Sequence, residues 1–132
     1  MDNVPICPHH EGMSLAAKVL VCVVALLHVY FMVLEMLLWT KPRGLRVFGQ
    51  TLERAQATAV LAANQGLYNG FLAAGLAWSL LHPDAAFGRQ IALFFLGCVA
   101  VAGVYGGRTV NPKIFVVQSV PALLGLAALL AT

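Results

Sequence analysis

Long apolar runs occupy almost the whole chain and alternate with short polar connections. Four of these runs cover Ser14–Leu38, Ala55–Leu81, Gln90–Gly106 and Ile114–Ala131. A helix of about 20 apolar residues crosses the hydrocarbon core of a bilayer, which is about 30 Å thick. The pattern therefore predicts an all-α integral membrane protein, with a polar tail in residues 1–13 and four spans in residues 14–132.

The connections between the predicted spans carry residues that interrupt helices. Lys41-Pro42-Arg43-Gly44 follows the first span, His82-Pro83-Asp84 follows the second, and Asn111-Pro112 precedes the fourth. Short connections make successive helices antiparallel neighbours, so the expected architecture is an up-down-up-down four-helix bundle. Residues 41–50 form the one connection with room for a functional element.

Basic residues are concentrated in two of the three connections. Six of them lie in or beside the first and third connections: Lys41, Arg43, Arg46, Arg54, Arg108 and Lys113. Only Lys18 and Arg89 lie on the opposite side. Basic connections stay in the cytoplasm, so we expect both termini outside it, across the inner (cell) membrane if the protein is bacterial.

The overall composition agrees with a membrane protein. The chain is 61% hydrophobic and 10% charged, whereas soluble domains carry about 25% charged residues. The net charge of +3 is explained by the basic residues of the predicted cytoplasmic connections. We therefore expect membrane lipids as partners and no nucleic acid. No phosphate-binding glycine loop or nucleophile motif is evident.

The N-terminal tail contains three side chains that bind copper or zinc in other proteins, namely Cys7, His9 and His10. The alternative is a disordered tail, which two prolines favour, and we predict no metal site here. Cys22 and Cys98 lie in predicted spans, where a cysteine is ordinarily a small packing residue.

Ionisable side chains at membrane depth usually face a partner or a cavity. Along the first helix, Glu35 and Trp39 each lie about 20° from His28, on either side of it, so the three side chains share one narrow helix face. The Glu35 carboxyl group needs a compensating cation or a proton. Arg54 or Arg108 could supply the charge, or the group could be protonated.

Further polar residues of the other spans fall in the same cytoplasmic half, so we predict a polar pocket that opens toward the cytoplasm. The candidate catalytic residues are Glu35, Tyr105 and Arg108. The candidate ligand-binding residues are His28, Trp39, Arg54, Asn64, Gln65, Tyr68 and Gln118. Alternatively, such groups only join helices by hydrogen bonds worth about 0.6 kcal/mol each, which is the preferred interpretation for Thr58, Asn69 and Ser119.

The second predicted span reads AANQGLYNGFLA over residues 62–73. This segment resembles the second helix of the membrane-associated proteins in eicosanoid and glutathione metabolism, and its Ala-Asn-Gln run looks closest to their leukotriene-pathway accessory member. Tyr105-Gly106 is similar to that family's tyrosine near the end of the third helix. The resemblance implies a four-helix homotrimer with a cytoplasmic first loop that binds a lipophilic ligand, as a transferase, a peroxidase or a binding protein.

Two positions depart from the pattern of the glutathione-using members. Asn64 and Tyr68 match it, but Val60 and Leu67 stand where those members carry arginine and glutamate. The two charged side chains with which those members bind glutathione as a cofactor are therefore absent from this sequence. The whole chain looks more like a small bacterial and fungal membrane family of unknown function.

Three functions remain open at this point. The first is binding of a small lipophilic or amphipathic ligand, with or without catalysis. The second is proton-coupled transport, in which Glu35 exchanges a proton for the substrate. The third is a structural or assembly subunit whose polar groups only hold helices together.

Overall fold

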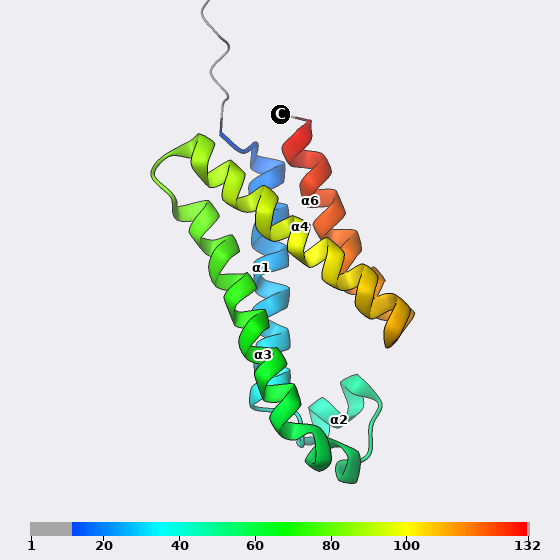
Figure 1. Cartoon of the computed structure of the whole chain (residues 1–132). Helices are drawn as coiled ribbons and strands as arrows, with labels where there is room; N and C mark the ends of the chain where they lie inside the picture. The colour runs from blue at the N-terminus through cyan, green and yellow to red at the C-terminus, as the bar shows by residue number, and fades with distance from the viewer. Residues whose placement is uncertain (1–11, 132) are drawn as a thin grey trace, which may run out of the picture.

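The computed structural model describes residues 12–131, which fold entirely into helices and short connections (Figure 1). The four long elements are α1 (Leu15–Met36), α3 (Leu52–Leu81), α4 (Ala85–Thr109) and α6 (Val120–Leu130). A short helix α2 (Pro42–Phe48) lies between α1 and α3, and α5 (Pro112–Ile114) and the π-helical segment η1 (Phe115–Ser119) lead directly into α6. The predicted all-α class is confirmed, while Cys7, His9 and His10 lie outside the described residues.

A polar side chain marks the start of each membrane-length helix. The Oγ atoms of Ser14 and Thr51 accept hydrogen bonds from backbone N–H groups three residues later, at 3.2 Å in both cases. The side chain of Asp84 accepts from an N–H group three residues later and that of Asn111 from one two residues later, both at 2.9 Å. The first N–H groups of a helix have no partner within it, so these caps fix where each helix begins.

Three helices are long and apolar enough to cross a membrane: α1, α4 and the continuous run Pro112–Leu130. Helix α3 has 30 residues, a length of about 45 Å, but no stretch of it has the mean hydropathy of the other three spans. Its polar residues Asn64, Gln65 and Asn69 account for the difference. Length and composition thus confirm three of the four predicted spans and an integral membrane protein.

Two local features differ from the predicted elements. Residues 41–50 contain helix α2 rather than a simple loop, and the last span contains the π-helical turn η1 directly after α5. In that turn the N–H of Val120 donates to the carbonyl of Phe115, five residues earlier. Pro121 follows immediately and has no N–H to donate, so the regular helical bonding pattern is interrupted at this point.

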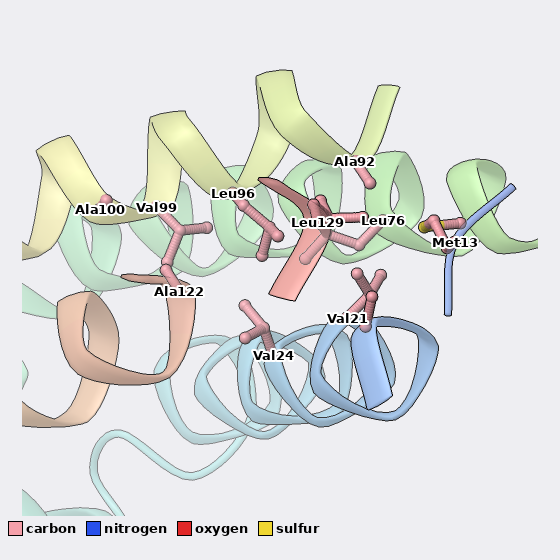
Figure 2. Packing of buried hydrophobic residues seen from close by; sticks show 11 residues of the cluster. Met13, Val21, Val24, Leu76, Ala92, Leu96, Val99, Ala100, Ala122 and Leu129 are labelled. Carbon is pink, nitrogen blue, oxygen red and sulfur yellow. The ribbon is translucent and has the colours of Figure 1, made fainter. Parts of the chain in front are cut away.

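The long helices run in alternating directions and form two pairs, α1 with α3 and α4 with the η1–α6 rod (Figure 1). The pairs pack together at the end of the molecule that carries the C-terminus. Their shared core there includes Val21, Val24, Leu76, Leu96, Val99, Ala122 and Leu129 (Figure 2). At the other end, α4 and η1 turn away from α1 and α3.

The second pair is held by a close approach of α4 to η1. The Ser119 hydroxyl donates to the carbonyl of Ala100 at 2.8 Å, as expected for a residue that joins helices. Gly103 lies against Ser119, so that a Cβ atom added at Gly103 would lie 2.8 Å from the Ser119 backbone nitrogen. The absence of a side chain at Gly103 therefore allows this contact.

We predict that Gly103→Ala destabilises the protein by about 1 to 3 kcal/mol, because the added methyl group must displace the backbone of Ser119. Thermal unfolding of the detergent-solubilised protein measures the effect. Gly97→Ala is the matched control, since nothing lies within 4 Å of a Cβ atom at that position. Equal unfolding temperatures for the two variants would contradict this view of the α4–η1 contact.

Candidate functional site

The carboxylate of Glu35 is bound by two amide side chains of the neighbouring helix. Glu35 lies in the last turn of α1 and is 5% exposed. Gln65 Nε2 donates to Glu35 Oε1 at 3.0 Å, and Asn69 Nδ2 donates to Glu35 Oε2 at 2.7 Å. Gln65 and Asn69 are four residues apart on α3 and so present their side chains to the same side. We call Glu35, Gln65 and Asn69 the carboxylate clasp.

Gly66 lies between the two amide residues and lets α1 approach α3 closely. A Cβ atom at this position would lie 3.0 Å from Glu35 Cβ and 3.2 Å from the carbonyl oxygen of Met32. Both contacts are tighter than ordinary van der Waals packing. The glycine thus brings the two helices near enough for the short amide side chain of Asn69 to reach the carboxylate.

The clasp supplies hydrogen bonds but no positive charge. Arg54 and Arg108, the predicted cation partners, are both exposed, and within residues 12–131 the side-chain donors to Glu35 are the two amides alone. Glu35 also lies at the carbonyl end of α1, where the helix dipole disfavours a negative charge. A proton or a cationic group beside Glu35 would therefore lower the free-energy cost of burying this carboxyl group.

His28 is buried inside the bundle and is satisfied by its own helix. It is 1% exposed, and its Nδ1 lies 2.8 Å from the carbonyl of Val24. Since a carbonyl oxygen only accepts, Nδ1 carries a proton in this arrangement. The ring also packs edge-on against Phe31, with centroids 5.6 Å apart. These contacts give His28 a packing role, and its predicted part in ligand binding remains a prediction.

Trp39 joins the end of α1 to α3. Its Nε1 donates to the hydroxyl of Thr58 at 3.1 Å, and its ring contacts Phe48 of α2 with centroids 4.7 Å apart. The Thr58 hydroxyl in turn donates to the carbonyl of Arg54 at 2.8 Å. The expected helix-joining role is thus confirmed for Thr58, as it is for Asn69 and Ser119.

Two predicted site residues lie on the outer face of α3, away from the clasp. Asn64 is exposed, and Tyr68 is 59% exposed with its ring against Phe71 at a centroid distance of 5.6 Å. Gln65, also exposed, reaches Glu35 only through its amide nitrogen. Of the α3 residues predicted to bind ligand, Gln65 alone contacts Glu35.

Tyr105, Arg108 and Gln118 lie on the other helix pair. Tyr105 is 71% exposed, and with Arg108 it lines an open depression of about 550 Å³ whose lining residues all belong to α4. Gln118 is half-buried in η1, close to Gly103. Among the described residues no hydrogen bond joins these three to the clasp. The expected convergence on Glu35 is therefore not seen within one chain, because the two helix pairs diverge at this end.

The sequence comparisons point to a family without an assigned activity. The family model described as "Protein of unknown function (DUF1304)" matches residues 22–130. The "Uncharacterized protein YpaA" of Lactococcus lactis subsp. lactis (strain IL1403) is 31% identical over 116 residues, which are 86% of this chain and 96% of that protein. No solved structure matches the chain. The expected likeness to a family of unknown function is confirmed, and neither description mentions eicosanoid or glutathione metabolism.

We expect Asn69→Ala to lower the free energy of unfolding by about 1 to 3 kcal/mol, because one oxygen of a buried carboxylate loses its donor. Thermal or denaturant unfolding in detergent measures the change. Gln56→Ala removes an exposed amide from the same helix and should stay within about 0.5 kcal/mol of the natural protein. If Asn69→Ala lowers the free energy of unfolding no more than Gln56→Ala does, the hydrogen bond from Asn69 to Glu35 does not stabilise the protein.

Proposed function

The chain belongs to the DUF1304 family of proteins of unknown function, and we propose that it is a four-span membrane protein that binds a small lipophilic or amphipathic ligand beside Glu35. The observation that carries this proposal is a carboxyl group in an apolar span whose side-chain donors, among residues 12–131, are two neutral amides. Such groups at this depth are costly and usually serve an ion, a proton or a substrate.

Helix α3 is the proposed fourth span. It is longer than a bilayer core requires, and it lies alongside α1 (Figure 1). Two of its amide side chains donate to Glu35. These hydrogen bonds reduce the free-energy cost of placing the two amides inside a bilayer. With the basic connections in the cytoplasm, both termini lie outside, and the clasp lies in the cytoplasmic half of the membrane.

The clasp favours a ligand with a hydrogen-bond donor or a positive charge in its polar part. Both amide nitrogens of the clasp already donate to the carboxylate and neither carries a charge, so a cationic group of the ligand would supply what these two donors do not. The apolar part of the ligand would then lie along the apolar surfaces of the spans. An amphipathic molecule entering from the bilayer meets both requirements.

We further propose that the site is completed in a homo-oligomer, a trimer by the resemblance to the eicosanoid and glutathione proteins. Asn64 and Tyr68 are exposed on the outer face of α3, and an unpaired amide is disfavoured against lipid. In such an assembly, Tyr105 and Arg108 of one subunit would donate to an anionic group of the ligand. Val60 and Leu67, in place of the charged glutathione ligands, favour binding over glutathione-dependent transfer.

Proton-coupled transport is the second candidate. The same observation favours it, since an acidic group in an apolar span suits reversible protonation when, as in the described part of this chain, its donors are neutral amides. The position of Glu35 in the last turn of α1, rather than at mid-span, is less typical of a carrier. Substrate flux driven by a pH gradient in proteoliposomes distinguishes the two functions, because binding alone produces no flux.

We predict that native mass spectrometry of the purified protein, with no ligand added, shows an oligomer that carries a defined small mass. Glu35→Gln removes the charge with little change in shape and should abolish the bound mass. Tyr105→Phe and Arg108→Ala should weaken binding of the identified ligand by about tenfold, as expected for loss of a hydrogen bond to a charged group.

Glu53→Gln is the control for this experiment, because it removes an exposed carboxylate at the start of α3. It should leave the bound mass unchanged. An unaltered bound mass in Glu35→Gln would refute the ligand site. The absence of any bound mass, together with a pH-driven flux that Glu35→Gln eliminates, would favour the transporter.

A further inference from the structure

A compact basic segment follows the end of α1 directly. Lys41, Arg43 and Arg46 are exposed and lie in or next to helix α2, which begins six residues after Met36. No acidic residue occurs between Glu35 and Glu53 in the sequence, and Glu35 is already bound by two amides. The segment therefore presents three cationic side chains without a local carboxylate to neutralise them.

The backbone of this segment is fixed by close packing and by a tight turn. A Cβ atom at Gly44 would clash with the carbonyl of Leu38, so α2 lies directly against the turn that follows α1. Gly49 ends α2 at φ 60°, a conformation that side chains rarely adopt. The contact of Trp39 with Phe48 and Thr58 joins the segment to α3. The basic side chains thus project from a defined scaffold.

Arg43 is directed toward the membrane-spanning part of α1. Its Nη2 donates to the hydroxyl of Tyr30 at 3.1 Å, and its guanidinium carbon lies 5.7 Å from the centre of the tyrosine ring. Tyr30 lies six residues before the end of an apolar span. The remaining guanidinium N–H groups of an arginine in this position can donate to a phosphate.

Apolar side chains accompany the charges. Val47, Phe48 and Leu52 are each at least 39% exposed. A segment that combines basic residues with exposed aromatic and aliphatic side chains has the composition of an element that lies in the head-group region. A site for a soluble phosphate has no need of these apolar groups, so they favour a lipid as the occupant.

We propose that Lys41, Arg43 and Arg46 form a binding site for the phosphate group of an anionic phospholipid, with Arg43 held in place by Tyr30. Charge complementarity and the position beside the end of a span carry this inference. It does not depend on the proposed ligand of Glu35, since the two groups of residues are different. The lipid would occupy the surface of α1 and α2 at the cytoplasmic boundary.

The test is a lipid titration of the detergent-solubilised protein, followed by native mass spectrometry and thermal unfolding. Phosphatidylglycerol should bind and raise the unfolding temperature, whereas phosphatidylcholine should do neither. Arg43→Gln combined with Arg46→Gln should weaken phosphatidylglycerol binding by about tenfold or more. Lys18→Gln, which removes an exposed charge at the other end of α1, should leave binding unchanged.

Tyr30→Phe keeps every charge and removes the hydroxyl that accepts from Arg43. It should weaken binding by about threefold, consistent with a single lost hydrogen bond, and it serves if the double variant does not fold. Equal binding of the two lipids, or an equal loss in the Lys18 control, would overturn the proposal. Displacement of phosphatidylglycerol by millimolar glycerol phosphate would show a site for soluble phosphate instead and would also overturn it.

Discussion

A carboxylate inside an apolar span needs hydrogen-bond donors or a positive charge to offset its lost hydration. The packing of α1 against α3 depends on the donors that Glu35 receives from α3. Asn69 and Gln65 each donate one hydrogen bond to Glu35, and Gly66 between them allows the helices to approach. The same bonds use two of the polar groups that make α3 less apolar than the other long helices. The interaction therefore supports both the helix pair and the proposal that α3 crosses the bilayer.

The second constraint is that the two helix pairs share a core at only one end. The buried cluster of α1, α3, α4 and α6 lies at the end that carries the C-terminus (Figure 2), while α4 and η1 diverge from α1 and α3 at the other (Figure 1). The polar residues of the molecule are consequently divided between two surfaces. This division is the physical reason for proposing that a second subunit completes the site.

The sequence predicted correctly those features that depend on residue composition alone. Apolar runs located α1, α4 and the last span, and the polar types at Thr58, Asn69 and Ser119 correctly indicated helix-joining hydrogen bonds. Periodicity placed Glu35 on an inner face but could not identify its partners, since that depends on which helix lies opposite. It also could not reveal α2 or the π-helical turn, because the contact at Gly44 and the approach at Gly103 are tertiary.

The most direct test of the central claim, that α3 crosses the membrane with its amides bound to Glu35, is the accessibility of its two ends. Single cysteines at Glu53 and Ala86, both exposed positions, would be introduced into a chain without Cys7, Cys22 and Cys98 and labelled with a membrane-impermeant maleimide. The account predicts labelling of position 86 from outside the cell and of position 53 only after the membrane is opened. Labelling of both positions from the same side would contradict it.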